Sequence, residues 1–360
     1  SEGGTPMVLS AGNKDIRELA HGRTKLAEMV GLFTKWSAEV THADQIPYVM
    51  RRAFNEAKSP PTGPTFVGFS ANALDSELDV DISRSQTGYF NIRPDNSAIE
   101  EATRILASAS SPIMIVSDRV GESNATNEAI RVAELLGAKV YASIYSSMNF
   151  PTSHPQFAGR VRLGFPETSN LLDEADVILM VGKLMTDNYM FSAPQLRFFN
   201  PHSKLIHLDI SASEIGKTQP TEVGIISDPK AGLNKLTESL EACLSRSEKN
   251  IAKKRLKSLT LAKSKNAKAW QHQICERWNH VPMSAERMMA EIKTAMPHNV
   301  LIVDDAVSSR DALYKTMEFD EPGSLLGGRG GALGWGMGGA MGMKLANPER
   351  PVIAIVGDGS

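Results

Sequence analysis

The feature that most constrains this chain is its C-terminal stretch, where a strand of the buried type leads directly into a glycine-rich turn. Residues Val352–Val356 form a short apolar run rich in β-branched side chains, and Gly357-Asp358-Gly359-Ser360 follows at once. Such a run is typical of a strand covered on both faces of a parallel sheet. Ligands bind beyond the carboxyl ends of these strands. Glycines there let the backbone approach a phosphate, and a carboxylate suits Mg²⁺.

Gly-Asp-Gly taken alone indicates only a tight turn after a strand. Here a glycine-dense loop begins at Gly327 and runs into a helix of small residues over Gly334–Leu345, and a polar turn at Asn347–Arg350 comes before the strand. A second glycine-rich loop close to a strand-end Gly-Asp-Gly favours a phosphate and magnesium site over a plain turn.

The composition excludes several classes of partner. A chain of 360 residues predicts two or three domains, and the net charge is −2. We therefore expect neither nucleic acid nor a membrane surface as a partner. The lysine-rich stretch 245–268 has no interleaved aromatic residues, so we interpret it as a solvated, partly helical connector.

The cysteines and the chain ends set two further expectations. Cys243 and Cys275 are the only cysteines and lie far apart, so neither a disulfide framework nor a zinc site is predicted. This fits a reducing compartment, which we take to be the cytoplasm. The chain begins at Ser1 without a methionine and stops inside the Gly-Asp-Gly motif, so we interpret it as an internal fragment of a longer protein.

Several stretches carry a resemblance to a known family. They are Gly331-Ala332-Leu333, the run Ala346–Arg350 leading into Gly357–Ser360, and the loop Phe150–Pro155. With them the chain resembles the thiamine-diphosphate enzymes of the acetolactate synthase, pyruvate oxidase and benzoylformate decarboxylase group, and looks closest to benzoylformate decarboxylase. The family's cofactor motif begins with Gly-Asp-Gly-Ser, and only this first half lies in the chain.

The expected architecture combines the residue pattern with this resemblance. Helices and strands alternate from 96 to about 245, which predicts a parallel sheet. We expect an α/β fold of three-layer domains with parallel sheets, in which thiamine-diphosphate-binding folds flank a Rossmann-like central domain. The expected divisions are the end of the pyrimidine-binding domain plus linker (1–95), the central domain (96–245), a basic linker (246–268) and the first part of the diphosphate-binding domain (269–360).

The resemblance also implies roles for individual residues. Asp358 would bind Mg²⁺, the carbonyl of Gly331 would accept a hydrogen bond from the aminopyrimidine, and Leu333 would lie under the bent cofactor. The phosphates would be held by Ser308, Gly357, Gly359 and Ser360. Val307 stands where the decarboxylase has a hydroxyl residue, so one contact is expected to be missing. No catalytic residue is assigned, because the family's essential glutamate is expected upstream of Ser1.

The leading functional hypothesis is a lyase, a decarboxylase that uses thiamine diphosphate and Mg²⁺ and leaves a cofactor-bound carbanion after a 2-oxo acid loses CO₂. The substrate stays open, because Asn188 or Tyr189 falls where benzoylformate decarboxylase has a histidine. The first alternative is a transferase of the acetolactate synthase type with FAD in the central domain, although no strand is followed by Gly-x-Gly-x-x-Gly. The second alternative is a non-catalytic nucleotide-binding protein.

The resemblance implies an assembly as well. We expect a homodimer or homotetramer with the active site at the subunit interface and a small 2-oxo acid as the substrate. The chain by itself is expected to be inactive, because the essential glutamate and half of the metal motif are not in it.

Overall fold

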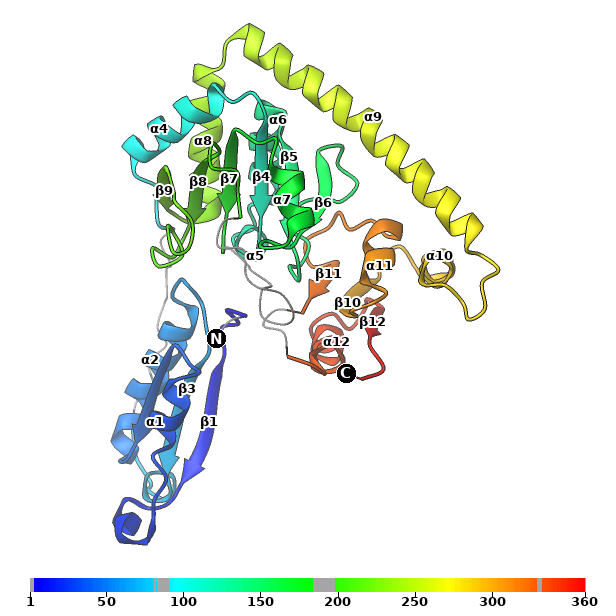
Figure 1. Cartoon of the computed structure of the whole chain (residues 1–360). Helices are drawn as coiled ribbons and strands as arrows, with labels where there is room; N and C mark the ends of the chain where they lie inside the picture. Colours follow the sequence, from blue (N-terminus) through cyan, green and yellow to red (C-terminus); the bar gives the residue numbers. More distant parts are fainter. Residues whose placement is uncertain (1–2, 81, 83–90, 184–197, 329–331, 360) are drawn as a thin grey trace. The chain divides into compact units, whose positions relative to one another are not determined.

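The computed structural model of the chain describes residues 3–80, 82, 91–183, 198–328 and 332–359. The described chain forms two compact units, Ser1–Phe90 and Asn91–Ser360, and each is considered by itself. Figure 1 labels the elements of both units.

The first unit is a small parallel sheet with helices beside it. The strand order is β1-β3-β2, and every neighbouring pair is parallel. Its core is formed by Val40, Ala53, Val67 and Ala73, with the apolar face of one helix packed against the sheet. The strands are Val8–Asn13 (β1), Trp36–Val40 (β2) and Thr65–Ser70 (β3). The helical segments are Ile16–His21 (η1), Leu26–Gly31 (α1), Ala43–Gln45 (η2), Ile46–Lys58 (α2) and Ala71–Leu74 (α3).

The second unit begins with a six-stranded sheet that is parallel throughout. The strand order is β6-β5-β4-β7-β8-β9, so the direction of winding changes between β4 and β7. The strands are Pro112–Val116 (β4), Lys139–Ser143 (β5), Phe157–Val161 (β6), Val177–Val181 (β7), Lys204–Asp209 (β8) and Val223–Ile226 (β9). The helices are Asn96–Ala107 (α4), Asp118–Glu122 (α5), Thr126–Leu136 (α6), Pro166–Leu172 (α7) and Pro229–Cys243 (α8).

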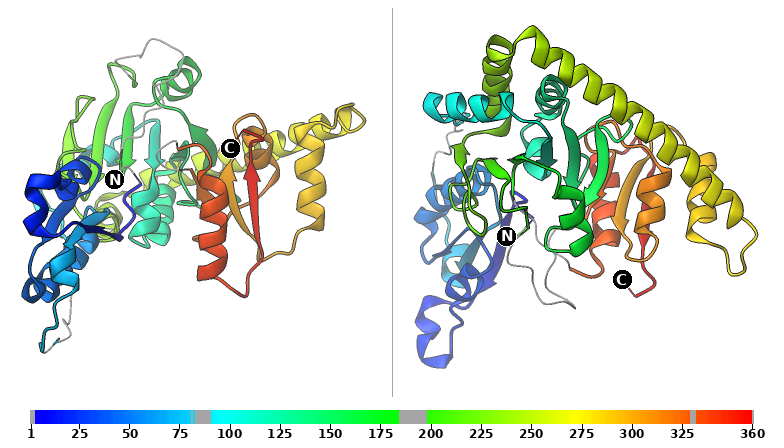
Figure 2. Two further views of the ribbon diagram at one scale, coloured as in Figure 1. Left: turned by 90° about the horizontal axis from the view of Figure 1, so that it is seen from below. Right: turned by 45° about the horizontal axis from the view of Figure 1, so that its top comes forward.

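Alternating strand residues bury both faces of this sheet. Met114 and Val116 of β4 join a core with α4, α6 and α8, whereas Ile113 and Ile115 face a second core that includes Leu172 of α7. The layers of helix, sheet and helix are visible in Figures 1 and 2. A strand with both faces buried needs apolar residues at every position, which explains the continuous apolar runs in the sequence.

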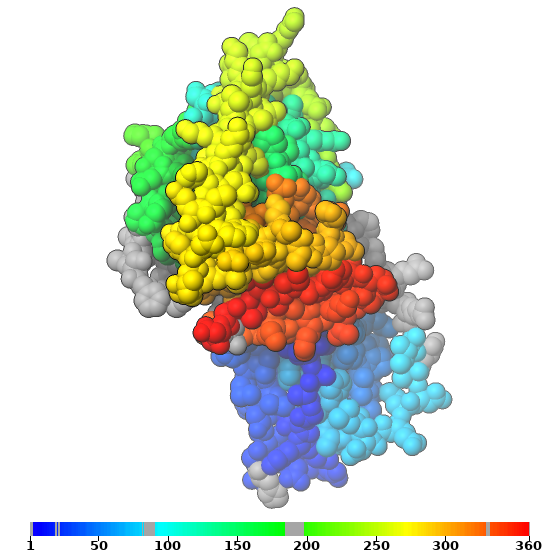
Figure 3. Space-filling model, turned by 90° about the vertical axis from the view of Figure 1, so that its right-hand side faces the viewer, coloured from blue at the N-terminus to red at the C-terminus, as the bar shows by residue number. Residues whose placement is uncertain are grey.

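A single helix of 31 residues, Arg246–Glu276 (α9), follows the six-stranded sheet. It begins with a capping box, in which Ser245 and Glu248 exchange side-chain and backbone hydrogen bonds. Only Ala252, Trp270 and Ile274 are buried, and Figure 3 shows the helix as a yellow ridge on the surface of the molecule. The stretch that the sequence indicates as a partly helical connector is therefore part of one continuous helix.

The chain ends in a three-stranded parallel sheet with the order β11-β10-β12. Met289 and Leu313, from two helices on one face, pack against Ile302 and Ile355 of the sheet. The small-residue helix contacts β10 and β12 (Figure 2). The elements are Ala285–Ala295 (α10), Leu301–Asp305 (β10), Arg310–Thr316 (α11), Leu325–Gly327 (β11), Trp335–Ala346 (α12) and Val352–Val356 (β12).

The architecture confirms the expected α/β class with parallel sheets flanked by helices. Both cysteines are free and exposed. No helix in the described part of the chain is at once long enough and apolar enough to cross a membrane.

The junction between α6 and α9 gives a test of the fold. Gly137 ends α6 with φ of 63°, and a Cβ there would lie 2.7 Å from the carbonyl oxygen of Ala252 on α9. We expect Gly137→Ala to lower the free energy of unfolding by about 2–4 kcal/mol. The alanine would be strained in the left-handed backbone conformation, and its Cβ would also clash with the backbone of α9. Gly323→Ala is the matched control, since Gly323 has φ of 79° but open space around a Cβ, and should cost only about 1 kcal/mol. Urea denaturation measures both, and equal losses would contradict the packing of α9 on this turn.

Candidate functional site

Three neighbouring parallel strands end at the same edge of the C-terminal sheet. Asp305, the last residue of β10, is in register with Val356 of β12, and Asp304 is in register with Gly327 of β11. The segments that follow these strands are therefore brought together. They are the turn 306–309, the two described ends of the glycine-rich loop (Gly328 and 332–334) and the turn at Gly357-Asp358-Gly359. This is the edge at which open α/β sheets bind ligands.

Most of the residues singled out from the sequence lie on these three segments. Ser308, Asp358 and Gly359 are exposed, and Gly357 is partly exposed. Leu333 lies just before α12 with 80% of its surface exposed. The structure thus brings the predicted side chains to one edge from three separate segments and leaves them open to solvent.

Other predicted residues fall outside the described part of the chain. Gly331, Ser360, Asn188 and Tyr189 are among them. Val307, expected in place of a hydroxyl residue, is described and is 78% exposed.

Asp305 fixes the start of α12 at this edge. Its Oδ2 accepts a hydrogen bond of 3.0 Å from the backbone N–H of Gly336, in the first turn of the helix. Position 336 must be glycine for this approach, because a Cβ there would lie 2.5 Å from the Cβ of Asp305. The preceding Gly334 has φ of 76°, which turns the loop into the helix. The carboxylate therefore acts as a helix cap supplied by another segment.

The neighbouring carboxylate, Asp304, is fully buried and has three donors. Its Oδ1 accepts from the N–H of Ala306 at 3.0 Å. Its Oδ2 accepts from Nε of Arg310 at 2.9 Å and from the hydroxyl of Tyr314 at 2.5 Å. The sequence interpretation did not identify this group. The available signal is the four-residue spacing of Arg310 and Tyr314, which puts both on one face of a helix just after the strand.

The surroundings shift the pKa of both donors from α11. Burial lowers the pKa of Arg310, but Asp304 together with Tyr314 and Tyr145 raises it by more, and the net shift is upward. Burial raises the pKa of Tyr314, and the same carboxylate raises it further although Arg160 opposes the shift. Arg310 is therefore a permanent cation and Tyr314 a neutral donor at physiological pH.

The described residues contain no group of three or more His, Cys, Asp or Glu side chains that could hold a metal ion by themselves. At this edge Asp358 offers an exposed carboxylate to a cation. Mg²⁺ is commonly bound in this way, by one or two carboxylates together with phosphate oxygens and water.

The carboxyl edge of the six-stranded sheet also carries an acidic side chain, but in the described part of this edge that side chain is buried and hydrogen-bonded. Asp209, at the end of β8, is fully buried, and its Oδ1 accepts from the N–H of Ser211 at 2.6 Å. Burial raises the pKa of this carboxyl group. Since it closes the turn that follows β8, Asp209 is poorly placed to receive a ribose hydroxyl from solvent.

The loop Phe150–Pro155 joins the two sheets of the second unit. Thr152 donates its N–H to the carbonyl of Phe319 at 3.0 Å and accepts the N–H of Phe319 on Oγ1 at 2.7 Å. His154 lies 3.4 Å from Glu134 and meets the ring of Phe150 edge to face. The loop therefore holds the C-terminal sheet region against the six-stranded sheet. His154 contacts Glu134 of α6 and Phe150 of its own loop.

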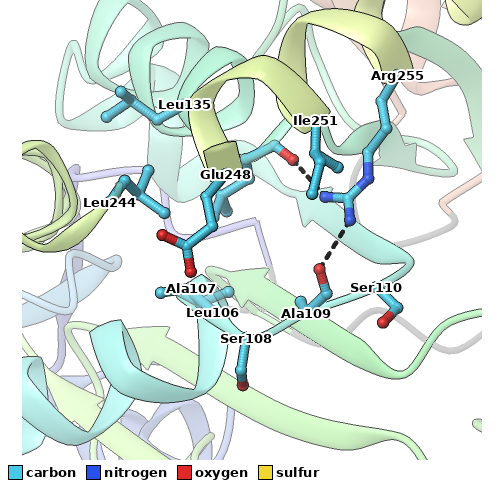
Figure 4. A pocket seen from close by; sticks show the side chains of 11 residues that line it. Leu106, Ala107, Ser108, Ala109, Ser110, Leu135, Leu244, Glu248, Ile251 and Arg255 are labelled. Atoms are coloured by element: carbon cyan, nitrogen blue, oxygen red, sulfur yellow. Dashed lines mark hydrogen bonds between the residues drawn. The ribbon is translucent and has the colours of Figure 1, made fainter. Parts of the chain in front are cut away.

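A hollow lies at the opposite end of the six-stranded sheet, next to the amino ends of β4 and β5 (Figure 4). Arg255 of α9 closes it by donating to the carbonyl oxygens of Leu136 and Ala109, at 2.9 and 2.8 Å. Leu135, Leu244 and Ile251 supply apolar walls. Because it faces away from the carboxyl edge, this hollow gives no support to a nucleotide site at the point where the winding changes.

Comparison with known proteins agrees with this architecture. Residues 99–236 match the family model described as thiamine pyrophosphate enzyme, central domain. Residues 305–360 match the model described as thiamine pyrophosphate enzyme, C-terminal TPP binding domain. The second match includes the three segments at the edge of the C-terminal sheet.

Individual relatives come from more than one class of enzyme. The chain is 25% identical to a probable acetolactate synthase large subunit of Methanococcus aeolicus, over 99% of this chain and 61% of the relative. It is 24% identical to the benzoylformate decarboxylase of Pseudomonas aeruginosa, over 99% of this chain and 65% of the relative. The solved benzoylformate decarboxylase of Polynucleobacter necessarius has the same fold, with a TM-score of 0.81 and 21% identity over 99% of this chain and 65% of that one. The chain thus spans less than two thirds of the length of these proteins.

The cap on α12 can be tested directly. Asp305→Ala removes the acceptor of the Gly336 N–H, and we expect a loss of about 1 kcal/mol in the free energy of unfolding. Asp305→Asn keeps an oxygen acceptor and should recover most of that loss. Asp311→Ala, which removes an exposed carboxylate paired with Lys315 on α11, is the control and should change stability by less than about 0.5 kcal/mol. Equal stability of all three variants in urea denaturation would rule out the cap.

Proposed function

The chain belongs to the family of thiamine-pyrophosphate enzymes, and from that premise we propose that it binds thiamine diphosphate with Mg²⁺ at the edge formed by β10, β11 and β12. The observation that carries the proposal is the convergence of three strand-end segments, one with Ser308, one rich in glycine and one with Asp358. A diphosphate needs hydrogen-bond donors and a cation, and these segments offer both kinds of group.

The residues at this edge fit such a ligand. A Cβ on Gly359 would meet no atom within 4 Å, so the backbone there is open to a phosphate. Ser308 supplies a hydroxyl donor and Asp358 a hard oxygen ligand, and both are exposed. Leu333, apolar and 80% exposed, offers a surface for the apolar part of a bound molecule.

Each group has a separate task in the proposed reaction. Thiamine diphosphate, when bound, supplies the electron sink that lets a 2-oxo acid lose CO₂. The N–H of Gly359 and the hydroxyl of Ser308 would hold the diphosphate, and Asp358 would bind the cation that neutralises it. Gly357 and Ser360 would complete the phosphate contacts, Leu333 would support the bend of the cofactor, and the carbonyl of Gly331 would orient its amino group. These groups would bind and orient the cofactor, and we assign no proton-transfer role to any residue that the structure describes.

We propose a decarboxylase of 2-oxo acids as the activity of the whole protein, working as a homodimer or homotetramer. Its resemblance to benzoylformate decarboxylase supports this, both in sequence and in fold. The burial of Asp209 is a further argument, because this strand-end carboxylate closes its own turn and is not open to a ribose hydroxyl of FAD. We therefore propose that the decarboxylase works without FAD.

A transferase of the acetolactate synthase type is the second candidate. The similarity to a probable acetolactate synthase large subunit over 99% of the chain favours it. The two candidates differ in the acceptor that reacts once CO₂ has been lost. A proton as acceptor gives an aldehyde, and a second 2-oxo acid gives an acetohydroxy acid.

Product analysis separates these candidates. We expect the full-length protein that contains this chain, supplied with thiamine diphosphate and Mg²⁺, to release CO₂ and form an aldehyde from pyruvate or from benzoylformate, each offered alone. Acetolactate from pyruvate, together with a yellow flavin on purification, would instead establish the transferase. Binding of ADP or NAD without any binding of thiamine diphosphate would contradict both and favour a nucleotide-binding protein.

The metal role of Asp358 has its own test. We expect Asp358→Asn to weaken activation by Mg²⁺ by about 100-fold, because the charged oxygen ligand is lost. Glu349→Gln is the matched control, since it removes one exposed carboxylate from the turn before the same strand, at the opposite edge of the sheet. Magnesium titrations of activity compare the two variants, and an unchanged midpoint in Asp358→Asn would exclude the assignment.

A further inference from the structure

A cluster of five side chains lies behind the edge of the C-terminal sheet. We call it the Asp304 cluster, and its members are Asp304, Arg310, Tyr314, Tyr145 and Arg160. The first three come from β10 and α11, and the last two come from the central sheet region, before and within β6. The cluster therefore joins the two sheets of the second unit.

The two halves of the cluster meet through stacked cations. The guanidinium of Arg310 lies 4.4 Å from the centre of the Tyr145 ring, and that of Arg160 lies 4.2 Å from the centre of the Tyr314 ring. Each half thus gives the other one cation and one aromatic face. Such contacts are strongest where water is excluded, as around the buried Asp304.

The backbone of the central domain reinforces this contact. Arg160 donates to the carbonyl oxygen of Ser146 at 2.7 Å, which fixes the loop that contains Tyr145. A Cβ on Gly327 would lie 2.5 Å from the carbonyl oxygen of Tyr145, so this loop presses on the end of β11. The N–H of Met148 donates to the carbonyl of Leu325 at 3.2 Å. One loop of the central domain therefore touches both β11 and the first turn of α11.

The cluster also holds the turn that carries Ser308. Asp304 binds the N–H of Ala306 on one side of that turn and Arg310 on the other. Between these two anchors lie only Val307, Ser308 and Ser309. Without the Tyr314 hydroxyl, Oδ2 of the buried Asp304 would keep Arg310 as its donor but lose half of its hydrogen bonding, and the turn would shift as the Asp304–Arg310 pair rearranges.

Charge provides a second link to the edge. The cluster contains two guanidinium groups and one carboxylate, so it has an excess of one positive charge in a largely buried setting. The edge beyond it carries the carboxylates of Asp305 and Asp358, and the excess positive charge of the cluster offsets part of their repulsion of a bound anion.

We propose that Tyr314, Arg310 and Arg160 are positioning residues, which hold the 306–309 turn through Asp304 and so set the affinity of the edge for a diphosphate. This inference rests on the proposed function. Its consequence is that cofactor affinity depends on a contact between the central domain and the C-terminal sheet.

Tyr314→Phe tests the proposal with the smallest change. It removes one donor to Asp304 and keeps the ring under Arg160. We expect calorimetric titration of the full-length protein with thiamine diphosphate in saturating Mg²⁺ to show affinity reduced by about tenfold. Where turnover is measurable, the cofactor concentration for half activation should rise by the same factor, with little change in the rate at saturation.

Thr316→Val is the matched control. It removes another buried hydrogen bond of α11, from Nε1 of Trp270 to Oγ1 of Thr316 at 3.1 Å, at the end of the helix away from the turn. We expect a comparable loss of thermal stability with unchanged cofactor affinity. Arg160→Lys is a second test in the central domain, since it keeps the charge but loses the planar face. It should weaken cofactor binding by about threefold or more.

The outcomes are separable. Wild-type affinity in a folded Tyr314→Phe and in Arg160→Lys would overturn the positioning role. The same would follow if Thr316→Val weakened binding as much as Tyr314→Phe, because the effect would then follow general stability. If Tyr314→Phe does not fold, Arg160→Lys decides alone. A wild-type protein that binds no thiamine diphosphate would instead refute the proposed function.

Discussion

The burial of one carboxylate, Asp304, underlies the arrangement of the C-terminal sheet edge. Removing a charge from water costs several kcal/mol unless strong donors replace the lost hydration. Asp304 is fully buried and obtains its donors from the next turn of backbone and from two positions of α11. Those partners can be supplied only if the turn, the helix and the strand are all in place. The carboxylate thus makes the formation of this edge cooperative.

The same requirement extends to the central domain. Arg310 is stacked on Tyr145, which follows β5, and Tyr314 is stacked on Arg160 of β6. The loop after β5 also lies so close to position 327 that only glycine fits there. The proposed cofactor edge is therefore assembled from two layers. Its surface holds exposed groups such as Ser308 and Asp358, and beneath lies a closed group of paired charges and aromatic rings. In our proposal the exposed groups bind the ligand, and the closed group beneath keeps them in place.

Local patterns in the sequence identify part of this arrangement, and distant contacts account for the rest. The apolar run Val352–Val356 and its glycine turn predict a strand and a ligand edge because both signals are contiguous. The strand is found, but of its five residues only Ile355 is buried, so the expected cover on both faces is not seen in the described chain. Strand β6, over Phe157–Val161, has no such signal in the sequence, because Gly159 and Arg160 interrupt its apolar residues. The pairing of Arg160 with Tyr314 cannot be read from spacing, since the two residues meet only when the sheets dock. The Asp305 cap is equally hidden, because it acts on a helix of a later segment.

The most direct measurement is a crystal structure of the full-length protein with thiamine diphosphate and Mg²⁺. We predict density for the diphosphate between the turn that carries Ser308 and the turn that carries Asp358, with the cation bonded to the Asp358 carboxylate. Tyr314 and Arg310 should keep their bonds to Asp304 without touching the cofactor. Cofactor density at the carboxyl edge of the six-stranded sheet, or in the hollow beside Arg255, would contradict this account of the site.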